Sequence, residues 1–358
     1  MDALVIGGGK MGLAVAHDLV QHDASVTVID AARDCPAARL DDVISLEQLD
    51  ATDTKGVQRA MQRHDVAVSA LPYDFNYSLA EAAIDAGVHF CDLGGNTDMV
   101  KRELTLHDAA RAAGVTVVPD CGLSPGLTNV LGAHLIETAD ARELSIRVGG
   151  LPLEPKPPLD YALVFSVHGL INEYVEEARV LRNGRIATVE PLSGLETIEF
   201  DGFPQLEAFY TAGGTSTLPD TFAGRVETLD DKSIRYRGHR DKIKLLRDLG
   251  FFDNDMRAHT EWVLQSTLAS DVPDVVLARL TAVGATTQAI ELRDRYDADA
   301  GLSAMMRTTG FPTSVTALML ASGDIQACGC LPPERCVPAE PFIEALRERD
   351  ISIEVLAG

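Results

Sequence analysis

The stretch Ala3-Leu4-Val5-Ile6-Gly7-Gly8-Gly9-Lys10-Met11-Gly12 decides the fold, because an apolar run breaks there into closely spaced glycines. A second apolar run, Val26 to Ile29, follows it. This order predicts a strand, a glycine turn, a helix and a second strand. Gly7 would allow the tight turn, Gly9 would let the backbone approach a pyrophosphate, and Gly12 would let the helix pack closely on the strand. The stretch therefore predicts a dinucleotide site.

The second strand ends at Asp30, whose carboxylate can accept hydrogen bonds from the adenosine ribose hydroxyls. A 2′-phosphate at that place would meet a like charge, which favours NAD over NADP. Arg33 lies near enough in the sequence to keep NADP open as an alternative. The cofactor is expected to contact six residues of this first segment: Gly7, Gly9, Lys10, Met11, Gly12 and Asp30.

Composition and charge exclude several classes of protein. The chain has 358 residues and a formal net charge of −23, with 46% hydrophobic and 24% charged residues. Such a length suits about two domains. The negative charge disfavours nucleic acid and anionic membrane surfaces as partners. An acidic field can attract a cationic substrate, but a solvated surface that tolerates high salt is the plainer interpretation.

Six scattered cysteines form neither a secreted-type disulfide framework nor a convincing metal site. Cys328-Gly-Cys330 with Cys336 lacks a fourth ligand and the usual zinc spacing, so no metal is expected. No basic-then-apolar leader opens the chain, and no apolar run approaches the roughly 20 residues that span a bilayer. A cytoplasmic location is the expectation.

From residue 1 to about 125 short apolar runs alternate with helical stretches, which predicts a parallel sheet covered on both faces. The expected strands after the first two are Val66 to Leu71, Val88 to Leu93 and Val115 to Val118, and the expected helices are Tyr77 to Ala86 and Asp98 to Ala113. Because ligands bind beyond the carboxyl ends of parallel strands, the chemistry should lie at Ala70-Leu71-Pro72-Tyr73, at Asp92 and at Asp120.

After residue 126 the pattern changes to longer β-rich stretches, with Asn183-Gly184 as a two-residue hairpin turn. The expected strands are Leu144 to Val148, Ala162 to Val167, Arg179 to Val189, Glu196 to Phe200, Val275 to Ala282 and Gln288 to Arg295. The fold class is therefore α/β: a Rossmann-type parallel-sheet domain (1–125 with 305–358) that binds NAD, and a mixed α+β domain (126–304) for substrate binding and dimerisation. The tail from 305, including a possible edge strand Ile351 to Leu356, is expected to pack on the first domain.

Two motifs resemble the saccharopine dehydrogenase-like family. Pro119 to Asn129 resembles that family's strand-to-helix junction, and Ser69 to Tyr73 resembles its nicotinamide-side loop. Four further stretches resemble the L-lysine 6-dehydrogenase group within it: 149–159, 178–184, 234–239 and 242–252. Arg237 stands where the family often has proline. The resemblance covers nearly the whole chain and implies oxidation of the ε-amino group of L-lysine by NAD, giving ammonia and allysine, which cyclises to a piperideine carboxylate.

The chemistry of amine oxidation makes independent demands on the site. The amine must lose a proton before a hydride can leave, and at a pKa near 10.4 this costs roughly 4 to 5 kcal/mol at pH 7. The site then needs a base, and a negative neighbour for the iminium. Asp92 and Asp120 meet these needs by position, with Tyr73 as a proton relay. The alternatives are that Asp92 caps the Gly94-Gly95 turn, that Asp120 caps a helix, and that Tyr73 is a stacking wall.

Further residues are candidates for binding. Ser124-Pro125 is expected to open a helix whose N–H groups hold a carboxylate or a carboxamide. Arg235 suits the substrate carboxylate, and Asn129 and His239 are candidate hydrogen-bonding groups. Weaker candidates for the α-ammonium group are Asp160 and Glu207, and Lys156 is expected to face solvent.

Two other functions remain open from the sequence. A saccharopine-type dehydrogenase would act on a secondary amine and would have to hold three carboxylates, which demands more Arg or Lys at the site. A non-catalytic NAD-binding sensor would keep the glycine stretch without the chemistry. A small-molecule amino-acid substrate is the expected partner, and a homodimer is expected because edge strands of a mixed sheet often pair between subunits.

Overall fold

The computed structural model describes residues 1–357. The chain divides into two compact units. Unit 1 comprises Met1–Val130 with Met306–Arg349, and unit 2 comprises Leu131–Met305 with the residues from Asp350 on. Two of the three boundaries between the units fall inside helices, α6 (Thr128–Thr138) and α11 (Ala304–Ser322), and the third follows Arg349.

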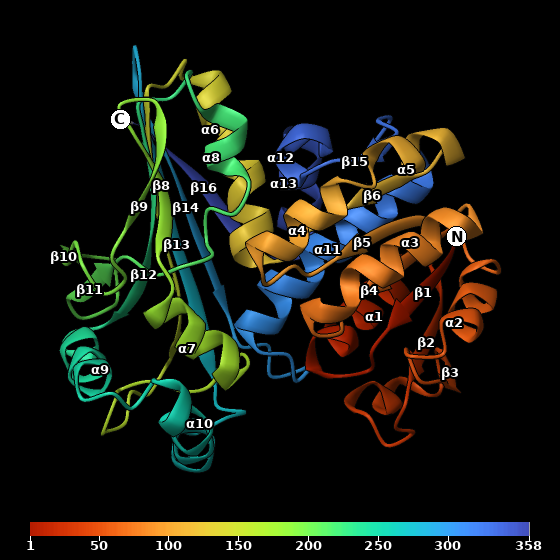
Figure 1. Ribbon diagram of the computed structural model, residues 1–358, viewed down its shortest axis with the longest axis horizontal. Helices are drawn as coiled ribbons and strands as arrows, with labels where there is room; N and C mark the ends of the chain where they lie inside the picture. The colour runs from red at the N-terminus through yellow and green to blue at the C-terminus, as the bar shows by residue number, and fades with distance from the viewer. Residues whose placement is uncertain (358) are drawn as a thin grey trace. The chain divides into compact units, whose positions relative to one another are not determined.

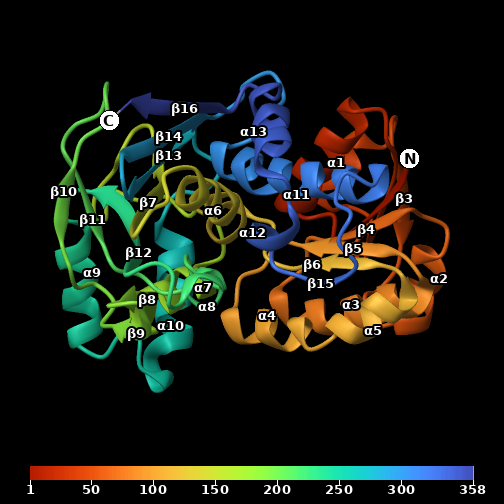
Figure 2. The same cartoon turned by 90° about the horizontal axis from the view of Figure 1, so that it is seen from above.

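Unit 1 is built on a parallel sheet whose described strands follow the order β15-β6-β5-β4-β1-β2-β3. From β3 to β6 this is the doubly wound order of dinucleotide-binding domains. Figure 2 shows α1, α11 and α13 on one face of the sheet and α3, α4 and α5 on the other. The strands are β1 (Asp2–Ile6), β2 (Ser25–Asp30), β3 (Ser45–Gln48), β4 (Val66–Ser69), β5 (His89–Asp92), β6 (Thr116–Val118) and β15 (Gly329–Cys330).

The central strands of this sheet are mostly apolar because helices cover both faces. Ala3, Leu4 and Val5 of β1 are wholly buried, and so are Ala67 and Val68 of β4. The helices of unit 1, besides α6 and α11, are α1 (Lys10–Gln21), α2 (Thr54–Met61), α3 (Asn76–Ala86), α4 (Thr97–Leu104), α5 (His107–Ala113), α12 (Pro333–Cys336) and α13 (Ala339–Arg347), and short 3-10 turns span Pro36–Leu40 and Tyr73–Phe75.

Unit 2 is built on a mixed sheet, in which the described strands run β10-β11-β12-β7-β13-β14-β16 and β8 pairs with β12 and β9. Only the β12–β7 pairing among these is parallel. Its strands are β7 (Glu143–Pro152), β8 (Ala178–Arg182), β9 (Arg185–Val189), β10 (Glu196–Ile198), β11 (Leu206–Phe209), β12 (Thr228–Tyr236), β13 (Asp274–Val283), β14 (Thr287–Arg295) and β16 (Ser352–Ala357), and its helices are α7 (Val167–Val175), α8 (Leu218–Phe222), α9 (His239–Asp248) and α10 (Asn254–Thr267). Figure 1 labels these elements. The predicted class, a Rossmann-type sheet plus a mixed-sheet domain, is confirmed.

The hairpin turn at Asn183-Gly184 is confirmed, since both residues have positive φ and β8 pairs with β9 around them. The predicted strand Ala162 to Val167 is wrong. This segment is irregular until α7 begins at Val167, because the Ser166 hydroxyl accepts a hydrogen bond from the Gly169 N–H at 3.1 Å and caps the helix.

The predicted helix Asp98 to Ala113 is two helices, α4 and α5, separated at Thr105 and Leu106. The Thr105 hydroxyl donates to the Arg102 carbonyl at 2.6 Å, which satisfies a carbonyl at the end of α4. At the end of the chain, α13 belongs to unit 1, whereas β16 pairs with β14 in the sheet of unit 2.

Candidate functional site

The glycine turn after β1 has the geometry of a pyrophosphate cradle. Gly7 has a φ of +100°, which a side chain would strain. A Cβ on Gly12 would lie 1.8 Å from the Gly7 carbonyl oxygen, so only glycine lets α1 pack this close to the turn. A Cβ on Gly9 would meet nothing within 4 Å, and α1 begins directly after it with no acidic residue in its first turn. The open space at a helix N-terminus fits an anionic group.

Asp30 closes this cradle at the end of β2. Its carboxylate accepts hydrogen bonds from the Gly8 N–H at 2.7 Å and from the Ala32 N–H at 2.8 Å. These two bonds fix the carboxylate beside the glycine turn while the side chain stays partly exposed. Its remaining acceptor capacity suits ribose hydroxyls. The residues of unit 1 therefore fit a dinucleotide.

The segment after β4 lies against the same turn. The Ala70 N–H donates to the Ile6 carbonyl at 2.8 Å, and a Cβ on Gly7 would meet the Leu71 side chain at 2.8 Å. Pro72 ends this segment, and Tyr73 begins a short 3-10 turn. The aromatic ring of Tyr73 would lie 3.4 Å from a Cβ placed on Gly95. The sequence prediction that these residues border the cofactor stays a prediction, and their placement beside the cradle is compatible with it.

Asp92 and Asp120 come together at the carboxyl ends of β5 and β6. The Asp92 carboxylate accepts from the Gly94 N–H at 2.7 Å and from the Asp120 N–H at 3.2 Å, and its carbonyl accepts from the Cys121 N–H at 2.8 Å. A Cβ on Gly94 would lie 1.8 Å from the Asp120 carboxylate. Both carboxylates are buried, and burial raises the pKa of Asp92 to about 6. The expected capping of the Gly94 turn by Asp92 is present.

Glu103 joins this group, although no sequence pattern pointed to it. It lies on α4, is wholly buried, and its side chain is within hydrogen-bonding range of Asp92. Burial together with the charge of Asp92 raises the pKa of Glu103 strongly. A glutamate on an amphipathic helix is ordinarily assigned to the solvent face, so no sequence signal marked this one.

Ser124 and Pro125 do not open a helix, which corrects the expectation. Both are extended, Gly126 has a φ of +124°, and α6 begins only at Thr128. The Ser124 hydroxyl accepts from the Thr128 hydroxyl at 3.0 Å. The helix starts late because the chain first folds back tightly on the end of β6 at Gly126. A Cβ on Gly126 would lie only 2.7 Å from the Asp120 carbonyl oxygen.

Asn129 is wholly buried in the first turn of α6, in unit 1. Its side-chain oxygen accepts from the Gly126 N–H at 3.4 Å, whereas its amide nitrogen has no acceptor within residues 1–357. A buried amide donor of this kind is costly unless water or a ligand satisfies it. Asn129 thus keeps its candidacy as a hydrogen-bonding group.

Arg235 and His239 meet in unit 2 through the hydroxyl of Tyr174. The Arg235 guanidinium donates to Tyr174 at 3.3 Å and to the Glu173 carboxylate at 3.1 Å, and it lies over the ring of Tyr161 at 5.0 Å. The His239 ring contacts the Tyr174 hydroxyl at 3.0 Å and the Leu159 carbonyl at 2.9 Å. The carbonyl contact requires an N–H, so the other ring nitrogen accepts from Tyr174.

These contacts set the charges of the group. Burial lowers the pKa of His239 to about 3, so its ring is neutral at physiological pH. Burial raises the pKa of Glu173 to about 7, although Arg235 beside it works in the opposite direction. Arg235 is therefore already paired with a carboxylate inside unit 2.

Asp231 is a second functional candidate that the sequence did not reveal. It shares one face of β12 with Ser233 and Arg235, since alternate residues of a strand point the same way. Asp231 is 4% exposed, and one of its carboxylate oxygens has no hydrogen-bond partner within residues 1–357. Burial raises its pKa to about 7. A Cβ on Gly214 would lie 2.3 Å from the other oxygen, so the glycine loop covers this carboxylate with backbone alone.

The weaker candidates have other partners. The Glu207 carboxylate accepts from the Gly238 N–H at 2.8 Å and from the Arg240 N–H at 2.7 Å, which caps α9. Asp160 accepts from the Lys242 ammonium at 2.7 Å. Lys156 is exposed, as its proline-rich loop suggested. Glu207 and Asp160 therefore serve contacts within unit 2.

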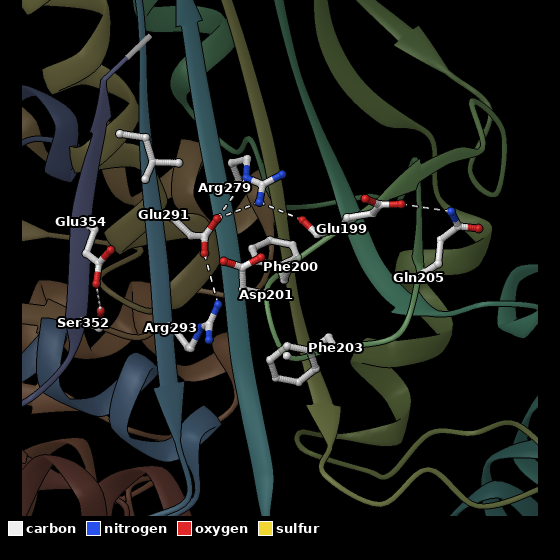
Figure 3. A pocket seen from close by; sticks show the side chains of 12 residues that line it. Glu199, Phe200, Asp201, Phe203, Gln205, Arg279, Glu291, Arg293, Ser352 and Glu354 are labelled. Atoms are coloured by element: carbon white, nitrogen blue, oxygen red, sulfur yellow. Dashed lines mark hydrogen bonds and ion pairs between the residues drawn. The ribbon is translucent and has the colours of Figure 1, made fainter.

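A separate hollow of about 780 Å³ lies on the sheet of unit 2 (Figure 3). Glu291 of β14 pairs there with Arg279 at 2.7 Å and with Arg293 at 3.4 Å, and Arg279 and Arg293 lie over the rings of Phe200 and Phe203. Of the described residues that line the hollow, none is a predicted site residue. Both arginines among the described lining residues of this hollow are paired with Glu291, so neither guanidinium is left to bind an anion.

Other expectations concern metals and membranes. The six cysteines are unpaired in the structure, and the described residues contain no group of three or more metal-ligating side chains. No helix within residues 1–357 has the length and the apolar character that crossing a bilayer requires.

Two domain families match almost the entire chain. Residues 3–118 match the Saccharopine dehydrogenase NADP binding domain, and residues 122–351 match the Saccharopine dehydrogenase C-terminal domain.

Among curated relatives, saccharopine dehydrogenase (NADP+, L-glutamate-forming) of Schizosaccharomyces pombe is 26% identical over 220 residues, which cover 57% of this chain and 47% of the relative. The mitochondrial alpha-aminoadipic semialdehyde synthase of Mus musculus is 22% identical over 390 residues, with coverage of 82% and 41%. The chain thus spans about half the length of the curated relatives it matches.

Two solved structures share the fold. Apo saccharopine dehydrogenase (L-Glu forming) from Saccharomyces cerevisiae superposes with a TM-score of 0.81 at 18% identity, covering 99% of this chain and 100% of that one. Homospermidine synthase from Legionella pneumophila, solved with NAD, gives a TM-score of 0.73 at 12% identity, with coverage of 100% and 91%. Because the nucleotide-binding and C-terminal domain models match residues 3–118 and 122–351 in succession, the chain belongs to the saccharopine dehydrogenase family.

Proposed function

We propose that this chain is an NAD-dependent dehydrogenase that oxidises the ε-amino carbon of L-lysine, giving allysine, ammonia and NADH. One observation carries the proposal: two buried carboxylates, Asp92 and Asp120, meet at the carboxyl edge of the sheet that carries the glycine cradle. An amine needs a base before it can lose a hydride, and carboxylates at this edge supply one. Bound NAD would supply the hydride acceptor.

The residues of unit 1 divide the remaining work. A buried carboxylate favours the positive charge that develops on the substrate nitrogen when the hydride leaves. After it has released the proton taken from the amine to solvent, the same carboxylate can accept a proton from the water that attacks the iminium carbon. It can then pass this proton to the carbinolamine nitrogen, so that the C–N bond breaks and ammonia leaves. Tyr73, beside Gly95, is proposed to relay a proton or to form a wall of the site.

NAD is proposed over NADP because of Asp30, although the family description and the yeast-type relatives name NADP. Its carboxylate is held at the end of β2, where the 2′-phosphate of NADP would meet like charge. Titration of the protein with both dinucleotides tests this, and we expect NAD to bind at least tenfold more tightly. Asp30→Ala should reduce the ratio of NAD affinity to NADP affinity. Asp34 is an exposed neighbour, and Asp34→Ala should leave this ratio unchanged. Tighter binding of NADP by the unmodified protein would refute the assignment.

Unit 2 taken by itself favours a substrate with ammonium groups. On one face of β12 and the adjoining α7, two buried or partly buried carboxylates, Asp231 and Glu173, accompany the guanidinium of Arg235. Arg147 also acts on Asp231, but its guanidinium is paired with Asp230 and Glu196. Saccharopine carries three carboxylates and would need more cationic groups than this face offers. Lysine carries two ammonium groups and one carboxylate, which suits this excess of acid.

The test is an assay with purified protein, NAD and L-lysine that follows NADH absorbance together with ammonia release. Lysine deuterated at the ε-carbon should transfer deuterium to NADH, and lysine deuterated at the α-carbon should not. Turnover with saccharopine but not with lysine would favour the secondary-amine reaction, and no turnover with any amine would favour a sensor. The homodimer and the cytoplasmic location stay predictions.

A further inference from the structure

Two carboxyl groups meet in the interior of unit 1. Glu103 projects inward from α4, Asp92 lies at the end of β5, and both are wholly buried. The two side chains lie within hydrogen-bonding range of each other. Within residues 1–357 neither Glu103 oxygen nor the second Asp92 oxygen receives a hydrogen bond from an N–H or hydroxyl group. Two ionised carboxylates buried side by side repel each other, so the pair favours a state in which one of them carries a proton.

The surroundings offer no countercharge that would keep both groups ionised. The titratable groups that act on the pair are Asp120, after β6, and the thiols of Cys121 and Cys330. Each of these is neutral or negative. Like charges and burial both favour the neutral form of a carboxyl group, and at Glu103 the charges of Asp92 and Asp120 add to the effect of burial.

The proton belongs on Glu103 because the surroundings of Asp92 stabilise its ionised form. The Asp92 carboxylate accepts from the Gly94 and Asp120 N–H groups, at 2.7 Å and 3.2 Å. Hydrogen bonds from backbone N–H groups favour a carboxylate. Glu103 has no such donor in the described part of the chain and can donate only if it is protonated.

We propose that Glu103 is a neutral carboxylic acid that donates its proton to the Asp92 carboxylate, and that Asp92 is a positioning residue while Asp120 is the base. The assignment of the base rests on the proposed function, but the protonation of Glu103 does not. With both its oxygens engaged inside unit 1, Asp92 holds the Asp120 backbone in its left-handed conformation, φ +60°, with the Asp120 carboxylate packed against Gly94.

The first test does not require activity. In infrared difference spectra at pH 9, where Asp231 and Glu173 with pKa values of about 7 are ionised, the carbonyl band of a neutral carboxylic acid should be present in the unmodified protein and lost in Glu103→Gln. Glu81→Gln, a change at an exposed helical glutamate of unit 1, should keep the band. A band of equal strength in Glu103→Gln would overturn the protonation of Glu103, whatever reaction the protein catalyses.

The second test uses lysine oxidation. Glu103→Gln retains a neutral donor, so its kcat/KM should stay within about threefold of that of the unmodified protein, with the same fall at acidic pH, the acidic limb. Glu103→Met lacks the donor and should lose at least tenfold in kcat. Asp120→Asn should abolish the acidic limb, and Asp92→Asn should lower kcat but keep that limb. If Asp92→Asn removed the limb and Asp120→Asn kept it, the two roles would be reversed and the proposal overturned. If Glu103→Gln lost as much as Glu103→Met, Glu103 would act as a carboxylate.

Discussion

The buried carboxyl group of Asp231 should make unit 2 less stable at alkaline pH, and Asp231→Asn should remove this weakness. Burial raises the pKa of Asp231 from 3.8 to about 7. A carboxyl group whose pKa is higher in the folded state binds its proton more tightly there, so its contribution to stability is complete at low pH. That contribution is lost as the pH rises from about 4 through about 7.

The size of the effect follows from the shift. About three pKa units at 1.36 kcal/mol each give an upper value of about 4 kcal/mol between pH 4 and pH 8. Arg147 and Arg235 stabilise the ionised form while Asp230 and Glu173 oppose it, and the carboxyl group interacts with all four. We therefore expect a change of about 2 to 4 kcal/mol.

The assay is urea unfolding followed by far-ultraviolet circular dichroism at pH 5, 6, 7 and 8. The single tryptophan, Trp262, is mostly exposed and would be a poor reporter. Asparagine introduces an amide that needs its own acceptors, but this cost does not depend on pH. The informative quantity is thus how the stability difference between Asp231→Asn and the unmodified protein changes with pH.

The stability difference should shift in favour of Asp231→Asn by about 1 to 3 kcal/mol between pH 5 and pH 8, because about two of the three units of the pKa shift lie in this range. Asp241→Asn is the matched control, because the Asp241 side chain is 72% exposed and should show no such shift. A constant difference across this range would refute the reasoning, since Asp231 would then be ionised in the folded protein throughout.

The remaining predictions concern both units. Asp230→Asn should destabilise the protein by about 2 to 4 kcal/mol at pH 7 in urea unfolding, because it would remove the carboxylate that pairs with Arg147 at 2.8 Å and with Arg182 at 3.0 Å and leave Arg147 with Glu196 alone. Arg349→Met should cost about 3 to 5 kcal/mol in the same assay, because it would leave the buried Asp18 carboxylate without a guanidinium at 2.8 Å, and equal stability would contradict this. Gly12→Ala should weaken NAD binding at least a hundredfold by calorimetry, since its Cβ would lie 1.8 Å from the Gly7 carbonyl oxygen; unchanged affinity would show that the turn can move.

The nucleotide half of the fold was predictable because its signals are local. Buried parallel strands are apolar throughout, and the glycine positions follow from close contacts within a few residues, as at Gly7 and Gly12. The false strand at Ala162 to Val167 arose because an apolar run does not distinguish a strand from an irregular buried segment. A serine cap, Ser166, outweighed that pattern.

The candidate site was predictable only in part, because burial of a charge leaves no mark on the sequence. Asp92 and Asp120 were found from their places after strands, and the hydrogen bond between them bears out their proximity. Glu103 and Asp231 were missed, since a carboxylate on a helix or in a strand is assigned to solvent unless its partners are known. Glu207 was considered as a substrate-binding residue for the same reason, because the sequence does not show that its carboxylate caps α9.

The alternation of side chains between the two faces of β12 has a consequence for redesign. Asp231, Ser233 and Arg235 lie on one face of this strand, while Asp230 and Lys232 on the other face hold an ionic network with Arg147 and Glu196. Three codons spaced two apart can therefore be randomised to search for new substrate preferences without altering the network behind them. Deleting a single residue would move each following side chain to the opposite face of the strand. Substrate specificity at β12 can therefore change by substitution but not by a change in the length of the strand.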